Sequence, residues 1–262
     1  MRGAFIASLM VSIMSMDSAS AAPAINLPTG SLRATFIATN PVQGIVDAKS
    51  GEVRGPAADL TAALGKQLGV PSKVTPSNGV QGVLQAVKNG DADIGFLAFD
   101  PGRAAEVDYS QIYSLAQNTY MVLENSPLKS INDIDRPGTR IGTTEGDTGD
   151  LYLTRTLKNV TFKRTKGDMD QALKMLRDKE IDAYGTNRQR LVELTRTNPG
   201  IRLLPDNFYG VPQAIIVKKG NKALLEAADR MLDEARRSGL IAASIKKVGL
   251  VGVDVAPSRG QK

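Results

Sequence analysis

The feature that most constrains the fold of this chain is a short pattern that occurs twice. Residues 84–95 and residues 173–184 each combine the end of an amphipathic helix, a polar turn and an Asp-headed run typical of a strand. The length of 262 residues allows one large core or two smaller ones. Because strands and helices also alternate elsewhere, the duplicated unit favours an α/β protein built as two lobes.

Proline and glycine residues mark the ends of the predicted helices. A helix is expected from Pro56, with Leu60 and Leu64 on its apolar face and Gly69 just beyond its end. Other expected elements are strands over residues 31–38, 120–123 and 214–217, a helix around 80–87 that ends at Gly90, and a long helix from Asn221 to about Gly239.

The first residues have the pattern of an export signal. Arg2 supplies a positive charge, residues 4–16 are apolar, and Ala19-Ser20-Ala21 has the small-residue spacing of a cleavage site. We therefore expect a signal peptide over residues 1–21, with an uncleaved membrane anchor as the alternative. The chain has no cysteine for a lipid anchor or a disulfide. These features predict a periplasmic protein that is exported, processed and not lipid-anchored.

The composition argues against several functions. The chain has no histidine, which is the commonest general base and metal ligand. Its formal charge of +6 comes from dispersed lysines and arginines, without a basic stripe interleaved with aromatic residues. We expect no nucleic-acid partner, no metal and no cofactor, and the expectation of an enzyme falls.

Polar residues follow three predicted strands, where ligands bind in open α/β sheets. Arg103 follows the first, a Gly-rich turn with Asp147 and Thr148 follows the second, and Asn187 ends the third. An arginine fork suits a carboxylate, and a helix start offers backbone N–H groups to an anion. Each feature also has an ordinary alternative, namely a surface arginine beside Glu106, or residues that only cap helices.

The order of these motifs resembles the amino-acid-type extracellular solute-binding proteins of ABC importers, known as family 3. Arg103 is followed, at the family's spacing, by Val107-Asp108-Tyr109-Ser110. Lys129–Ile134 is similar to the segment that opens the family's second lobe, and Lys219-Gly220-Asn221 precedes a long helix as it does there. The resemblance extends from about Leu32 to Leu250.

This resemblance implies a type II periplasmic-binding-protein fold, in which two lobes, each a mixed sheet flanked by helices, are joined by two hinge strands. It implies lobe one over residues 27–112 plus 214–256, lobe two over 118–208, and hinges at 113–117 and 209–213. It also implies closure of the lobes around a ligand. The expected partners are a small carboxylate-bearing solute and an ABC transporter permease, and we expect a monomer.

The resemblance further implies a binding site. Arg103 matches the family's carboxylate-binding arginine, and Asp147 and Thr148 lie where a helix start donates to the same carboxylate. Asn187 stands where amino-acid binders place an aspartate for the ammonium group, and losing that charge-assisted bond costs about 1.5–3 kcal/mol. Either Asp147 replaces the missing acid or the solute has no ammonium group.

Four more expected site residues depart from the family pattern. Thr39 and Asn78 stand where aromatic side chains usually clamp the ligand, and Ala98 stands where a hydroxyl usually contacts it. Phe36 replaces a polar residue of the first strand. The alternative is that Phe36 belongs to the core and that Thr39 and Asn78 are ordinary loop residues. The departures predict a reshaped pocket.

The first functional interpretation is therefore a periplasmic receptor that captures an amino acid or a related small carboxylate and delivers it to a permease. An enzyme on the same scaffold, as in some cyclohexadienyl dehydratases, is the second, with Asp147 or Glu145 as the acid or base. A ligand-sensing module of a receptor or a transglycosylase is the third.

Overall fold

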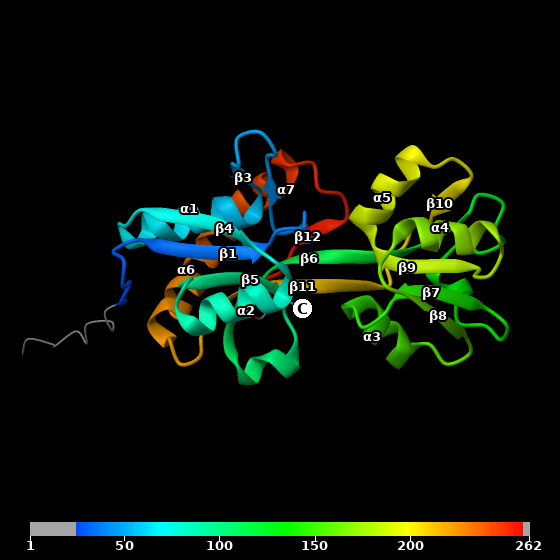
Figure 1. Ribbon diagram of the computed structural model, residues 1–262, viewed down its shortest axis with the longest axis horizontal. Helices are drawn as coiled ribbons and strands as arrows, with labels where there is room; N and C mark the ends of the chain where they lie inside the picture. Colours follow the sequence, from blue (N-terminus) through cyan, green and yellow to red (C-terminus); the bar gives the residue numbers. More distant parts are fainter. Residues whose placement is uncertain (1–24, 259–262) are drawn as a thin grey trace, which may run out of the picture.

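The computed structural model describes residues 25–258, so the expected signal peptide at residues 1–21 lies outside the described part of the chain. The described residues form two lobes, with two long strands running between them (Figure 1). Each lobe contains its own sheet region and its own flanking helices.

The strands, in chain order, are β1 (Leu32–Ile37), β2 (Ile45–Val46), β3 (Val53–Arg54), β4 (Ser72–Ser77), β5 (Ile94–Ala98), β6 (Val107–Leu123), β7 (Arg140–Thr144), β8 (Thr161–Thr165), β9 (Ala183–Asn187), β10 (Ile201–Leu203), β11 (Tyr209–Lys218) and β12 (Val253–Val255). The helices are α1 (Pro56–Leu68), α2 (Gly79–Asn89), α3 (Thr148–Thr156), α4 (Met169–Arg177), α5 (Arg188–Thr197), α6 (Lys222–Arg237) and α7 (Leu240–Lys247), with short 3₁₀ turns η1 (Pro101–Ala105) and η2 (Ile131–Asp133).

The strand order shows that β6 is shared by the two lobes. Lobe one has the order β4-β1-β5-β11-β6 and lobe two continues as β6-β9-β7-β8. In lobe one β1 is parallel to β4 and β5, and in lobe two β7 is parallel to β8 and β9. The pairs that involve β6 and β11 are antiparallel. Both lobes therefore have mixed sheets, as predicted.

The first two helices end where glycine allows a left-handed residue. Gly69 closes α1 with φ +68° and Gly90 closes α2 with φ +83°, and Pro56 occupies the first turn of α1. The predicted helix ends are confirmed at these positions.

Helices cover both faces of the sheet in lobe one. Along β5, Phe96 faces the core shared with α1, α6 and α7, whereas Leu97 faces the core under α2. The same alternation occurs along β11, where Ile215 and Ile216 face opposite sides. A strand with both faces buried reads as a continuous apolar run, which explains the residues of β5.

The sheet of lobe two is covered in the same way. Tyr120 and Val122 of β6 pack with Leu153 of α3, while Met121 and Tyr184 pack with α4 and α5 on the other face. The core residues of β6 thus belong to lobe one up to Ala116 and to lobe two from Tyr120 onward.

The duplicated sequence unit corresponds to a duplicated contact. In lobe one, Asp93 accepts from the backbone N–H of Arg33 at 2.8 Å and from its guanidinium at 3.1 and 2.7 Å. In lobe two, Asp182 accepts from the backbone N–H of Arg140 at 2.8 Å and from its guanidinium at 3.0 and 2.7 Å. The Asp just before each repeated strand therefore binds the second residue of β1 in lobe one and the first residue of β7 in lobe two.

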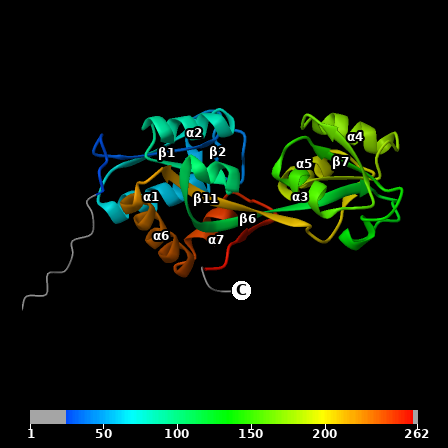
Figure 2. The same cartoon turned by 90° about the horizontal axis from the view of Figure 1, so that it is seen from below.

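Two of the predicted strands are longer in the structure. The expected short strands at 120–123 and 214–217 are parts of β6 and β11, which pair from Tyr209↔Asn118 to Lys218↔Val107. The strand β12 was not predicted. It pairs with β6, with Val253 opposite Ala116. Figure 2 shows this C-terminal segment beside the crossing strands.

Candidate functional site

A cleft of about 430 Å³ receives side chains from both lobes and from the strands that join them. Six of the residues expected from the sequence line it, namely Thr39, Ala98, Arg103, Asp147, Thr148 and Asn187. The lobe-one loop after β1, the turn after β5 and the starts of α3 and α5 converge here. The strand ends that the sequence indicated therefore meet at one cleft.

Two expected residues lie elsewhere. Phe36 is fully buried in the lobe-one core, where its ring packs against Gly44, so its side chain does not line the cleft. Asn78 is exposed at the N-terminus of α2 and is also outside the lining. For both residues the structure matches the alternatives of a core residue and a loop residue.

Arg103 is supplied to the cleft by the turn η1. Asp100 caps this turn by accepting from the backbone N–H of Arg103 at 3.2 Å, and the guanidinium donates to the carbonyl of Ala98 at 3.2 Å. Tyr109 donates its hydroxyl to the same carbonyl at 3.4 Å. Since no carboxylate pairs with Arg103 in the described residues, its charge is available to a ligand.

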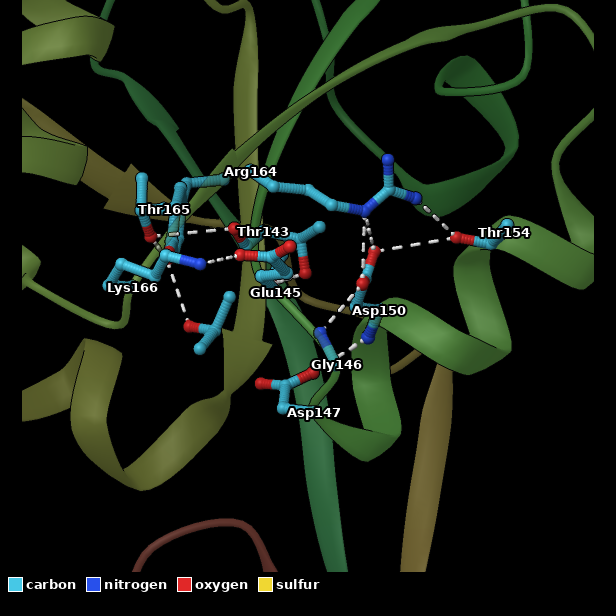
Figure 3. Close-up of polar contacts among 12 residues, drawn as sticks. Thr143, Glu145, Gly146, Asp147, Asp150, Thr154, Arg164, Thr165 and Lys166 are labelled. Carbon is cyan, nitrogen blue, oxygen red and sulfur yellow. Dashed lines mark hydrogen bonds and ion pairs between the residues drawn. The ribbon is translucent and has the colours of Figure 1, made fainter.

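The start of α3 is held in place by a buried acid. Asp150 accepts from Arg164 Nε at 3.0 Å and from the backbone N–H of Gly146 at 2.9 Å (Figure 3). Arg164 in turn donates to Thr154 at 2.8 Å. These bonds connect the Gly-rich turn to the first turn of α3, so the backbone that carries the Asp147 side chain is held in place.

Asp147 is the N-cap residue of α3. One of its carboxylate oxygens accepts from the backbone N–H of Asp150 at 2.7 Å. Burial raises the pKa of the Asp147 carboxyl, the nearby charge of Asp150 acts in the same direction, and the backbone bonds and Arg190 oppose them. An acid that is costly to ionise and lines a cleft is suited to pair with a cation brought by a ligand.

The start of α5 contributes Asn187 and Arg190. Asn187 is the N-cap residue, because its Oδ1 accepts from the backbone N–H groups of Gln189 at 3.0 Å and Arg190 at 3.4 Å. Its Nδ2 remains as the group that it offers to the cleft. A donor at this position suits an acceptor on the ligand and does not suit an ammonium group.

Two glutamines and an asparagine lie at the floor of the cleft. Gln43 donates to Gln213 at 3.3 Å, and both side chains are buried. Asn118, only 3% exposed, has an Nδ2 without a hydrogen-bond partner among the residues that the structure describes. Sequence reasoning missed these residues, together with Arg190, although Gln213 lies in an expected hinge and Arg190 is one helical turn beyond Asn187.

The enzymatic alternative finds little in this site. Asp147 is the only acid among the described residues that line the cleft, and Glu145 lies outside the lining in an ion pair with Lys166. General acid–base chemistry on a small carboxylate needs a group that can exchange a proton at the reacting atom. Asp147 is the one such group in the described lining, and the rest of the lining offers two arginines and several neutral amides, which is an arrangement for holding an anion.

Most of the chain matches a known protein family. The sequence profile described as bacterial extracellular solute-binding proteins, family 3, matches residues 32–250. Within the part of the chain that the structure describes, no helix has the length and apolar character needed to cross a membrane.

Individual proteins are also similar to this chain. GlnH, an ABC transporter glutamine-binding protein of Bacillus subtilis (strain 168), is 23% identical over 200 residues, which cover 75% of this chain and 72% of GlnH. The L-cystine-binding protein TcyJ of Escherichia coli (strain K12) is 24% identical over 202 residues, which cover 75% of this chain and 74% of TcyJ. Among solved structures, an ancestral arginine-binding protein bound to arginine matches with a TM-score of 0.63 and 28% identity, over 84% of this chain and 98% of that one.

Proposed function

Because this chain belongs to the bacterial extracellular solute-binding proteins of family 3, we propose that it captures an amino acid or a closely related small carboxylate and delivers it to the permease of an ABC importer. Membership of the family confirms the expected type II fold and the interpretation as a binding protein. The named relatives bind glutamine and L-cystine, and these names support an amino acid as the kind of solute.

One observation carries the proposal, namely that Arg103 from lobe one and the start of α3 from lobe two line the same cleft. A carboxylate held by the Arg103 fork would contact the N–H groups of α3 only when the lobes approach each other. Such a ligand stabilises the closed state in proportion to the contacts that it gains there. We assign the ammonium group of an amino acid to Asp147, because Asn187 offers only its Nδ2.

We also propose that residues 113–117 and 209–213 are the hinge. These segments pair with each other in antiparallel register, from Gly210↔Gln117 to Gln213↔Ser114. Lobe one then consists of residues 27–112 plus 214–256, and lobe two of residues 118–208. Motion at this paired region would move Arg103 relative to Asp147.

The site of action proposed for the chain is the periplasm. This rests on the expected signal peptide at residues 1–21 and on the extracellular character of the family. The mature protein is proposed to act as a monomer, since a single chain supplies every element of the cleft.

A thermal-shift screen with Arg103→Ala tests the function. An amino acid present at about a hundred times its dissociation constant adds roughly 2.7 kcal/mol to the stability of the wild-type protein, which raises Tm by about 5–10 °C. Arg103→Ala should lose this shift while keeping the circular dichroism spectrum of the wild type, because Arg103 is not a core residue.

The matched control is Arg237→Ala, which removes an exposed arginine paired with Glu234 on α6, away from the cleft. It should bind as the wild type does. Equal affinity of Arg103→Ala and wild type for the same amino acid would refute the assignment of the site.

A further inference from the structure

The cleft contains more positively charged than negatively charged side chains. Among the described residues, its lining contains two arginines, Arg103 and Arg190, and one acid, Asp147. A neutral amino acid has one carboxylate and one ammonium group, and would match Arg103 and Asp147 only. The second arginine would then have no negatively charged group of the ligand as a partner.

Arg190 differs from the other arginines of α5 in what it contacts. Arg188 donates to four oxygens of residues 204–207, and Arg196 pairs with Glu193 at 2.8 Å. Arg190 has only a long hydrogen bond, 3.4 Å, to the carbonyl of Gly167, and no ion pair to it occurs in the described part of the chain. Its guanidinium therefore retains most of its donors for a ligand.

Two asparagines of the cleft also offer donors rather than acceptors. Asn187 uses its oxygen to cap α5 and leaves its Nδ2 available. The Nδ2 of Asn118, which has no partner in the described part of the chain, lies near the first turn of α3, since a Cβ on Gly149 would be 3.9 Å from it. A buried donor without a partner is costly, so a ligand oxygen at this place would remove that cost.

From this arrangement we propose that the solute is an acidic α-amino acid, with two carboxylates and one ammonium group, and that Arg190 binds the second carboxylate. The inference rests on the proposed function and specifies its substrate class. Arg103 holds the α-carboxylate from lobe one, Asp147 holds the ammonium group, and Arg190 holds the side-chain carboxylate from lobe two. The three charges of the solute then match the three charges of the cleft.

Neutral and basic amino acids fit this cleft less well. The amide of glutamine presents one oxygen and one NH2 group to Arg190, so one of the two parallel bonds of the fork is replaced by opposed donors. A basic side chain would bring a second positive charge beside Arg190. The cleft should therefore discriminate by the charge of the side chain rather than by its length.

Isothermal titration of matched pairs tests the inference. The probes are L-glutamate with L-glutamine and L-aspartate with L-asparagine, together with L-arginine, titrated into wild type, Arg190→Gln and Arg196→Gln. One of the two acids, L-glutamate or L-aspartate, should bind the wild type at least about tenfold more tightly than its own amide. Arg190→Gln should weaken that acid about 10- to 150-fold and leave the amide almost unchanged, which removes the preference. Arg196→Gln, a loss of charge on the same helix, should retain it.

The other outcomes have distinct meanings. If a neutral or basic amino acid binds most tightly and Arg190→Gln does not alter the ranking, the inference is overturned while the proposed function stands. If Arg196→Gln lowers the affinity for the acid as much as Arg190→Gln does, the affinity depends on the total positive charge of α5 and not on a contact with Arg190. The inference is then likewise overturned. If none of the five amino acids binds the wild type, the inference is overturned, whereas the proposed function is decided by the thermal-shift screen with other amino acids and small carboxylates.

Discussion

The duplicated Arg–Asp clamp allows one substitution to be made in two environments. In lobe one the side chain of Asp93 is 6% exposed and that of Arg33 is 25% exposed, whereas in lobe two Asp182 and Arg140 are 35% and 40% exposed. In the wild type, both carboxylate oxygens of Asp93 accept from Arg33. Asparagine has only one acceptor oxygen, so Asp93→Asn turns an NH2 group toward donors of Arg33. We expect Asp93→Asn to cost about 2–3 kcal/mol, as for a largely buried charged hydrogen bond. Asp182→Asn should cost about 0.5–1 kcal/mol, because water replaces its lost bonds.

Thermal unfolding followed by far-UV circular dichroism measures the difference, since the chain has no tryptophan for fluorescence. At about 2–4 °C per kcal/mol, Asp93→Asn should lower Tm by about 4–12 °C and Asp182→Asn by about 1–4 °C. Glu180→Gln, which breaks the exposed pair with Lys163, is the control and should change Tm by less than about 2 °C. Equal losses from the two clamp variants would refute the argument that burial determines the contribution of this contact.

Two further substitutions test the packing and electrostatics of lobe two. Gly142→Ala should cost about 1–3 kcal/mol in urea unfolding, because the new methyl group would lie 2.5 Å from a ring carbon of Tyr184. The control is Gly82→Ala in α2 of lobe one, which should stabilise the protein by up to about 1 kcal/mol. A Gly142→Ala variant as stable as the wild type would contradict the rigidity assumed for Tyr184. Asp147→Asn keeps a good N-cap and removes an acid whose pKa is raised by burial, so the variant should be more stable than wild type at neutral pH. Because a raised native pKa means that stability is lost as pH rises through it, the Tm advantage should grow between about pH 4 and pH 7, and a constant difference would contradict the burial argument.

The parts of the fold that were predictable depend on local sequence. Pro56 and Gly69 bracket α1 because the first fits an initial helical turn and the second adopts the left-handed conformation that ends it. The repeated Asp-headed strands were visible as a pattern because each copy carries the same helix, turn and apolar run. The partners of those aspartates, Arg33 and Arg140, begin distant strands, and no local signal connects them.

The pairing of distant strands accounts for the strand lengths and site residues that the sequence did not reveal. In β6, polar residues such as Ser110, Ser114 and Asn118 are buried beside neighbouring strands, so the apolar pattern breaks although the strand continues. The same cause hid part of the site, because Asn118 and Gln213 face the cleft only through the pairing of β6 with β11. Arg103, Asp147 and Asn187 were accessible to sequence reasoning because each lies at the end of a strand or shortly after it.

The short strand β12 adds a constraint that a two-strand hinge does not have. Its residues pair with β6 beside Ala116, and Gln117 donates its backbone N–H to Gly252 at 2.7 Å and its side chain to Asp254 at 2.7 Å. The preceding residue, Val251, donates its backbone N–H to the side chain of Gln189 in lobe two at 2.5 Å. On the proposed function, closure has to bend three paired strands and rearrange a contact between the lobes. A solute that contacts both lobes must therefore gain more in the closed state than this rearrangement costs, which favours a ligand with charged groups for Arg103 and Arg190 together.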